Sequence, residues 1–148
     1  MSQQYIKILT QDLLHRKYQW KLGMNELNEP LEHKYRYGGF YVCDIKEFFR
    51  WIPIYPNMAW VSYVTIPDDA NKIVMERKIK TDKVILNGPL IPLIEFIDIA
   101  VKNGADINVN NGYVLTWASE NGRLEIAEHL LEYGACTVSS GIAKLNYN

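Results

Sequence analysis

The sequence predicts an α+β fold, in which a small N-terminal domain with a mixed or antiparallel β-sheet precedes a short α-helical segment. Two observations lead to this prediction. In residues 1–88, apolar and polar residues alternate in short runs rich in β-branched and aromatic side chains, which is typical of strands. In residues 89–148, apolar residues recur at helical spacing between glycine-containing turns. The tripeptide Asn87-Gly88-Pro89 is too short a linker to let the two regions move freely, so we expect one rigid body.

The N-terminal domain contains both strong and weak strand signals. Its residues 11–37 show no clear apolar period and are predicted to be mostly loop. Residues 67–70 are predicted to form a turn, because proline, aspartate and alanine follow a strongly alternating stretch. The predicted strands are 5–9, 39–43, 59–66, 72–76 and 83–86.

A short helix is predicted over residues 45–52. Asp44 precedes it, and its carboxylate can accept hydrogen bonds from the unpaired N–H groups of a first helical turn. A proline follows directly and ends the helix. Phe48, Phe49 and Ile52 fall on one side of this helix and are expected in the core.

The helical segment contains an internal repeat. Residues 92–106 align with residues 122–136 at an offset of 30, so that most apolar positions coincide and Gly104 corresponds to Gly134. Periods near 30 residues are typical of stacked supersecondary units. Four apolar residues of the second copy are expected to be buried against the helix of the first copy and the N-terminal domain: Leu124, Ile126, Leu130 and Leu131.

The repeated unit resembles an ankyrin repeat. Residues 122–136 match the family's G-H-L-E-I-V-x-x-L-L-x-x-G-A-D segment, and its G-A-D-I-N motif is intact at residues 104–108. The family's T-P-L-H motif, whose side chains normally link adjacent repeats, is replaced by Tyr-Val-Leu-Thr at residues 113–116. The resemblance implies one complete repeat, at about residues 106–134, between two partial ones. Roughly three repeats are needed to bury a continuous core. The segment therefore has to pack on the N-terminal domain, on another copy of the chain, or on both.

The first 88 residues resemble an N-terminal domain that precedes ankyrin repeats in many giant DNA virus proteins, including mimivirus-like ones. Three motifs carry this resemblance: GGFY at residues 38–41, WVSYVTIPDDA at residues 60–70 and KIKTDKVIL at residues 78–86. The resemblance implies the organisation of the chain and supplies no chemistry for this domain.

The two resemblances together imply a non-enzymatic protein–protein interaction module, whose partner is a host or viral protein or a second copy of the chain. A few repeats offer only a small surface, so we expect weak binding or a homodimer that pools two faces. Trp117 replaces the usual leucine of the first helix and is either a core residue or an exposed anchor. The predicted protein-binding residues are Val109, Asn110, Gly112, Trp117, Glu120 and Asn121.

Two other classes of function stay open. The order of His15, the strand 39–41 and the strand 60–64 is similar to that in ADP-ribosyltransferase-like folds, with Glu76 as the candidate catalytic glutamate. This alternative predicts a deep pocket that holds His15 and Tyr41. A structural assembly subunit would instead show a large apolar patch and form a stable oligomer.

Composition argues against several partners. The net charge is −1, with +3 in residues 1–88 and −4 in residues 89–148, so no general attraction to nucleic acid is expected. Cys43 and Cys136 have no metal-ligand spacing, and we expect neither a metal nor a cofactor. The N-terminus lacks the pattern of a signal peptide and no stretch approaches a membrane span. We therefore expect a protein that is not secreted and works inside the cell, in host cytoplasm or a viral factory.

Overall fold

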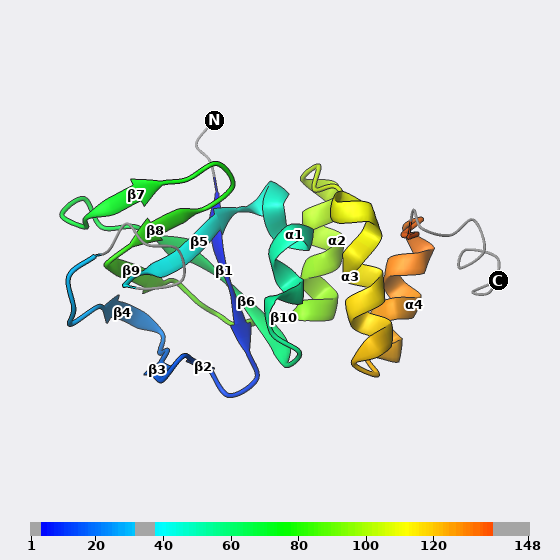
Figure 1. The fold of residues 1–148 in the computed structure, drawn as a ribbon, viewed down its shortest axis with the longest axis horizontal. Helices are drawn as coiled ribbons and strands as arrows, with labels where there is room; N and C mark the ends of the chain where they lie inside the picture. Colours follow the sequence, from blue (N-terminus) through cyan, green and yellow to red (C-terminus); the bar gives the residue numbers. More distant parts are fainter. Residues whose placement is uncertain (1–3, 32–37, 138–148) are drawn as a thin grey trace.

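The computed structural model describes residues 4–31 and 38–137, and within them the predicted α+β fold is confirmed. The first part of the chain forms an antiparallel sheet, and the helices lie side by side to one side of it (Figure 1). The predicted third, partial repeat lies largely outside the described residues, which end at residue 137. The helices are α1 (Phe48–Trp51), α2 (Leu93–Lys102), α3 (Val109–Glu120) and α4 (Leu124–Glu132).

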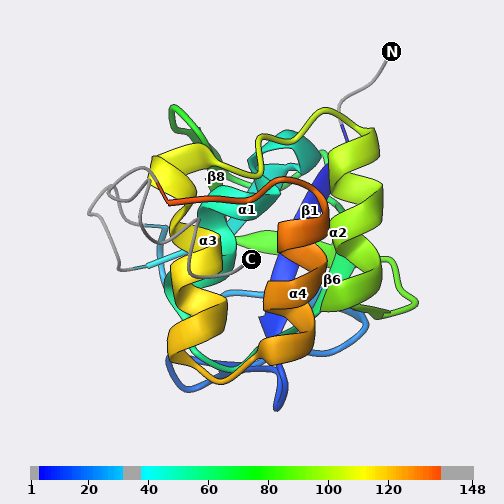
Figure 2. The same cartoon turned by 90° about the vertical axis from the view of Figure 1, so that its right-hand side faces the viewer.

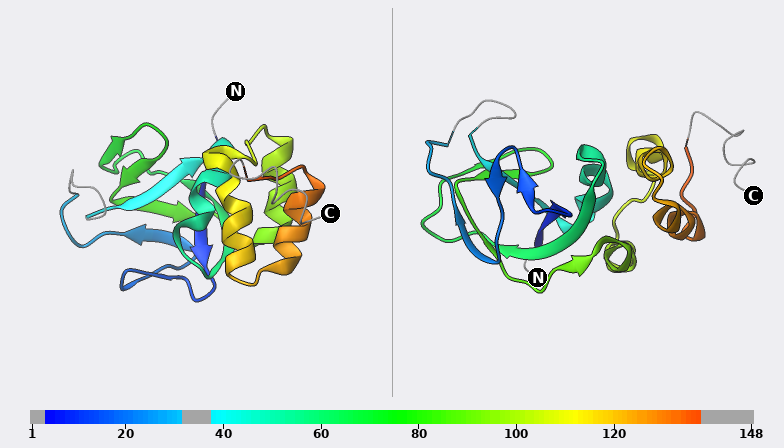
Figure 3. Two further views of the ribbon diagram at one scale, coloured as in Figure 1. Left: turned by 45° about the vertical axis from the view of Figure 1, so that its right-hand side comes forward. Right: turned by 90° about the horizontal axis from the view of Figure 1, so that it is seen from below.

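The main sheet has the strand order β4-β9-β6-β1-β5-β8-β7, and its pairings are antiparallel. A short strand, β10 (Ile91–Pro92), pairs with β6, and β2 (Leu14–His15) and β3 (Tyr18–Gln19) form a separate hairpin. Seen from below, the sheet curls around its own inner face (Figure 3). The remaining strands are β1 (Tyr5–Thr10), β4 (Gly23–Glu26), β5 (Phe40–Asp44), β6 (Met58–Thr65), β7 (Lys72–Val74), β8 (Ile79–Thr81) and β9 (Lys83–Leu86).

The strongest strand predictions are confirmed, and most of the described residues in 11–37 lie outside strands, as predicted, but the short strands within this range were not predicted. The range holds β2, β3 and β4. The two strands of the hairpin contain two residues each, which is too short for an alternating pattern to be visible. Strand β4 has the sequence Gly-Met-Asn-Glu, which has low strand propensity, and it is ordered by its pairing with β9. Such a pairing cannot be read from the local sequence.

The two faces of the sheet carry two separate apolar clusters. Strand β1 contributes Ile6 and Ile8 to the cluster beneath the helices, and Leu9 to the cluster on the inner face of the curl. The inner cluster also contains Trp20, Phe40 and residues of β6, β8 and β9. Successive side chains of a strand point to opposite faces of the sheet, so β1 contributes residues to both apolar clusters.

The predicted short helix is present as a helical stretch, 45–54, that includes α1. The Asp44 carboxylate accepts a hydrogen bond from the Lys46 backbone N–H at 2.9 Å, which is the capping contact expected from the sequence. Phe48, Phe49 and Ile52 are each at most 1% exposed, as predicted.

The helical segment packs on the same cluster as α1. Phe96 of α2 lies 5.0 Å from Phe48 between ring centroids and 5.8 Å from Tyr63 of β6. Ile126 and Leu130 of α4 are buried in this cluster, and Leu131 is half-buried against it. The expectation for Leu124 is wrong, since its side chain is 67% exposed. Leu124 is the first residue of α4, and at that point of the turn its side chain points away from the core.

Helix α3 begins with one left-handed turn. Asn110, Asn111 and Gly112 have φ values of 55°, 60° and 72°, a conformation that asparagine and glycine adopt most readily. A Cβ atom on Gly112 would collide with the backbone carbonyl of Cys136, which packs directly over this turn. The sequence Asn-Asn-Gly is thus suited to the turn both by backbone preference and by space.

We expect Leu130→Ala to lower the free energy of unfolding by about 2–5 kcal/mol, because Leu130 is fully buried. Leu124→Ala is the matched control and should change it by no more than about 0.5 kcal/mol, because Leu124 is mostly exposed. Chemical denaturation followed by circular dichroism measures both. A second unfolding transition in either variant would contradict the shared core.

Gly112→Ala should destabilise the protein by about 3 kcal/mol or more, since it adds a steric clash to left-handed backbone strain. Gly104→Ala is the control: Gly104 has φ 87° but open space around it, so strain alone should cost about 1 kcal/mol. Thermal melts of the two variants compare these costs. Equal destabilisation would mean that Cys136 does not pack over the turn.

Candidate functional site

The residues predicted to bind a partner do not form one surface. Trp117 is 3% exposed and Gly112 is buried, so neither of these two predicted residues lies on an accessible surface. The Trp117 indole N–H donates to the Tyr55 carbonyl at 3.0 Å, which settles its role as a core residue. A sequence pattern could not make this distinction, because tryptophan suits both a core and a binding anchor.

The four remaining predicted residues lie at the two ends of α3. Val109 is half-buried and Asn110 is exposed at the start of the helix, whereas Glu120 and Asn121 are exposed at its end. A helix rises 1.5 Å per residue, so the two pairs lie about 15 Å apart. They mark two separate exposed positions rather than one patch.

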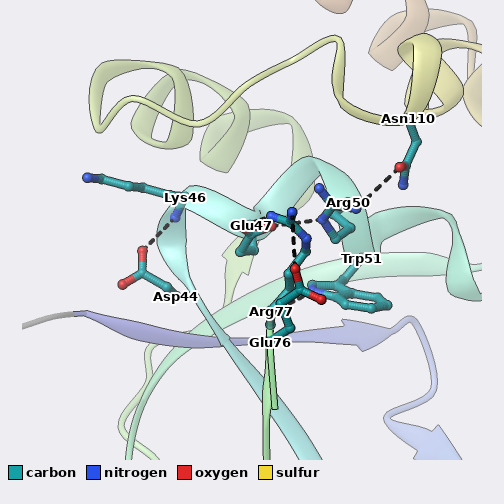
Figure 4. Close-up of polar contacts among 8 residues, drawn as sticks. All are labelled: Asp44, Lys46, Glu47, Arg50, Trp51, Glu76, Arg77 and Asn110. Carbon is teal, nitrogen blue, oxygen red and sulfur yellow. Dashed lines mark hydrogen bonds and ion pairs between the residues drawn. The ribbon is translucent and has the colours of Figure 1, made fainter. Parts of the chain in front are cut away.

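Asn110 is held by a polar network that ties the start of α3 to α1 (Figure 4). Arg50 of α1 donates to the Asn110 side-chain oxygen at 3.2 Å and pairs with the Glu47 carboxylate at 2.9 Å. Glu47 also lies 3.5 Å from Arg77, and the Trp51 indole donates to the Arg77 carbonyl at 3.1 Å. The network fixes the left-handed turn relative to the sheet.

The ends of α2 and α4 share one hydrogen-bond pattern. The N–H of Ala105 donates to the Ala100 carbonyl at 3.0 Å, and the N–H of Ala135 donates to the Leu130 carbonyl at 3.1 Å. Between them stand Gly104 and Gly134, with φ 87° and 85°. Both helices thus end in the same left-handed glycine cap.

Asn108 links the two repeated turns directly. Its side-chain oxygen accepts from the Cys136 backbone N–H at 2.8 Å, and its side-chain nitrogen donates to the Gly134 carbonyl at 3.3 Å. This asparagine is the last residue of the intact Gly-Ala-Asp-Ile-Asn motif. It provides a link between neighbouring turns in a chain that lacks the Thr and His of the ankyrin T-P-L-H motif.

The sheet splits where β1 and β5 diverge. The two strands pair only at Tyr5 with Asp44 and at Ile6 with Cys43, although β1 continues to Thr10 and β5 begins at Phe40. A pocket of about 790 Å³ opens at this split. Its lining includes side chains from both apolar clusters, so it passes from one face of the sheet to the other.

The pocket walls are aromatic and its charged groups are mainly cationic. Lys7 of β1 reaches across the split, where its ammonium donates to the Tyr41 carbonyl at 2.8 Å. Burial lowers the pKa of Lys7 to about 8, although part of the residue remains accessible through the pocket. The aromatic residues on the walls are Tyr18, Trp20, Phe40, Tyr41, Trp51 and Tyr55.

His15 is held in the neutral form on the pocket wall. Its Nε2 accepts a hydrogen bond from the Thr10 backbone N–H at 3.1 Å, and its ring packs 5.0 Å from that of Tyr55 between centroids. Burial, together with the nearby charge of Lys7, lowers the pKa of His15 to about 3. The other titratable group near Lys7 is Cys43, whose pKa is raised by burial to about 12, so that it stays a thiol.

The pocket contains His15 and Tyr41, as the ADP-ribosyltransferase-like alternative requires, but not its carboxylate. The Glu76 side chain is 86% exposed, pairs with Arg77 at 3.7 Å and is not part of the lining. Across the described ranges, no group of His, Cys, Asp and Glu residues has an arrangement that could hold a metal ion. None of the helices in residues 4–31 and 38–137 has the length and apolar character needed to cross a bilayer.

Comparison with known proteins gives no match, whether with family models, with curated proteins or with solved structures. The arrangement of the residues themselves therefore carries the functional argument.

Sequence reasoning missed Lys7, Trp20, Trp51 and Tyr55 as pocket residues. One signal was present at Lys7: a lysine in the middle of an otherwise apolar strand, Tyr-Ile-Lys-Ile-Leu, is unusual because both neighbouring faces are buried. The three aromatic residues carried no such signal, since Trp20 comes from one segment and Trp51 and Tyr55 from another, and only the fold brings the two segments together.

The neutral state of His15 makes stability depend on pH in a defined direction. Its pKa is near 6.5 in the unfolded chain and about 3 in the folded protein, so the unfolded state binds the additional proton in this range. The free energy of unfolding should therefore decrease as the pH falls below 6.5, by about 2 kcal/mol between pH 6.5 and pH 5. His15→Gln keeps an acceptor for the Thr10 N–H without titrating. Urea denaturation of both proteins at the two pH values should show a smaller loss in the variant, and equal losses would contradict a buried neutral His15.

Proposed function

We propose that the protein is a non-enzymatic protein-interaction module, related to the ankyrin proteins with this N-terminal domain in giant DNA viruses. The observation that supports the proposal best is the pair of repeated, exposed turns at Gly104 and Gly134, which Asn108 joins side by side. Repeat proteins build binding surfaces by stacking such turns at a constant spacing.

The helical segment has the rigidity that a recognition surface needs. Phe96 packs against Phe48 of α1 and Tyr63 of β6. Two hydrogen bonds hold α3 to the same part of the chain as α1: one joins Trp117 to Tyr55, and the other joins Arg50 to Asn110. A surface that is already ordered loses less conformational freedom when it binds. The helices α3 and α4 form the end of the molecule opposite the sheet, where a partner has access (Figure 2).

The size of this end limits the kinds of partner. A stable interface buries about 800 Å² on each side, which is more than two turns and one helix face offer alone. The partner is therefore a protein that also contacts α4, bound weakly, or a second copy in a two-fold dimer. We place such a protein in the cytoplasm or viral factory of an infected host, with a host or viral protein as its partner and no role in nucleic-acid or membrane binding.

A photo-crosslinking amino acid on α3 tests the proposal. Tyr113 and Glu120 are exposed and seven residues apart, so they lie on the same helix face. With p-benzoyl-phenylalanine at either position, we expect a covalent adduct with one protein, or an adduct of twice the chain mass if the partner is a second copy. Val74 of β7 is 72% exposed on the opposite side and is the matched control, at which no adduct should form.

Adducts of one molecular mass from both α3 positions, and none from Val74, would support the proposal. No adduct at α3, or the same adducts from all three positions, would remove it. A stable oligomer whose contacts lie on the sheet would favour the assembly-subunit alternative instead.

A further inference from the structure

We propose that the pocket at the split between β1 and β5 binds a small planar aromatic molecule that carries an anionic group. This site is separate from the helical surface and does not depend on the protein-interaction proposal. The ligand class follows from the space, the walls and the charges of the pocket.

The space is adequate for a small molecule. Pockets that bind small organic ligands measure about 300–1,000 Å³, and this one measures about 790 Å³. It forms because β1 and β5 separate after Cys43 instead of continuing their ladder towards Phe40. In a regular sheet, backbone hydrogen bonds between neighbouring strands leave no such gap.

The walls favour a planar ring. On the inner face of the sheet, Tyr18, Trp20 and Phe40 pack against one another with ring centroids 4.7 to 5.3 Å apart. From the helical side, Trp51 and Tyr55 complete the lining. Aromatic walls on both sides of an opening provide stacking and edge contacts for an aromatic ligand.

Lys7 supplies the recognition of an anion. Its ammonium has three N–H donors, of which one binds the Tyr41 carbonyl, and it lies 4.9 Å from the centre of the Trp20 ring. Among the described residues, no carboxylate lies within ion-pair distance of it. A buried ammonium is costly without an anionic partner, so an anion held between Lys7 and the aromatic walls would be stabilised there.

The other charged residues of the described lining are mostly cations. Arg16, Lys17 and Lys78 line the pocket, against Glu29 as the acidic residue among the described lining. The Lys78 ammonium lies 4.0 Å from the centre of the Tyr41 ring, which keeps a positive charge beside the aromatic walls. A concave site lined by cations attracts and concentrates anions.

The hairpin that carries two of these cations is strained. Arg16 and Lys17 have φ values of 50° and 72° in the two-residue turn between β2 and β3. Asparagine and glycine are the usual residues of such turns, and other residues there cost free energy. The sequence instead places two cations at these positions, on the rim of the pocket.

Two fluorescent probes that differ in one charge test the inference on the unaltered protein. The probe 8-anilinonaphthalene-1-sulfonate is an aromatic anion with a planar naphthalene ring, and N-phenyl-1-naphthylamine has the same rings without the sulfonate. We expect the anionic probe to bind with one-to-one stoichiometry and at least about tenfold more tightly than the neutral one, because it gains charge-assisted hydrogen bonds. Titration followed by fluorescence and calorimetry gives both affinities.

Variants of Lys7 place the effect in the pocket. Lys7→Met keeps most of the side-chain volume without the charge and should bind the anionic probe about tenfold more weakly, with little change for the neutral probe. Lys7→Arg should restore most of the preference. Lys46→Met, an exposed lysine outside the pocket lining, is the matched control and should bind as the unaltered protein does. Circular dichroism establishes that each variant is folded.

The pH dependence gives an independent readout. Lys7 has a pKa of about 8, and its charged or titratable neighbours are Cys43, Lys78, Arg16 and His15. Cys43 and His15 stay neutral near pH 8 because their pKa values are about 12 and about 3. Affinity for the anionic probe should therefore fall above pH 8 in the unaltered protein and stay level in Lys7→Met.

The inference is overturned if the two probes bind the unaltered protein equally well, or if folded Lys7→Met keeps the full preference for the anion. A Lys7→Met chain that does not fold leaves the probe comparison and the pH series on the unaltered protein as the deciding measurements. Binding of several anionic probe molecules per chain would also overturn it, because that result indicates general surface adsorption.

Discussion

The helices of this protein depend on the apolar face that β1 and β6 present to Phe48 and Phe96. A helical hairpin such as α3 and α4 buries too little surface to be stable alone. Here α1 and α2 bridge it to the sheet, and a single buried cluster extends from Ile6 of β1 to Leu130 of α4. The sheet thereby supplies the packing surface that the helical segment lacks on its own.

Strand β1 makes this packing possible, and it also creates the pocket. Its Ile6 and Ile8 side chains serve the core under the helices, whereas Lys7 points to the other face. Because β5 leaves β1 after two paired residues, the carbonyl of Tyr41 accepts from the Lys7 side chain rather than from a backbone N–H of β1. The local loss of a β-ladder is offset by a charged hydrogen bond, and the space it leaves is the pocket.

The two candidate sites have different physical bases. The helical surface rests on the repetition of a glycine cap and on a side-chain link through Asn108, which together make two turns adjacent and rigid. The pocket rests on the irregularity of the sheet and on side chains from segments far apart in the chain. A binding partner on the helices and a small ligand in the sheet would each contact residues that the other leaves free, although both sites share the framework around Trp51, Arg77 and Arg50.

The sequence by itself determined the α+β class, the principal strands, the Asp44 cap and the internal repeat. These features are local: they depend on alternation along a strand, on a capping carboxylate and on a glycine at each helix end. Tertiary structure alone decided that Trp117 is a core residue, that Leu124 is exposed and that Gly-Met-Asn-Glu forms a strand. It also decided that Lys7, His15, Trp20 and Trp51 meet in one pocket. The physical reason is that burial and strand pairing depend on segments far apart in the chain, whose relative positions no local pattern records.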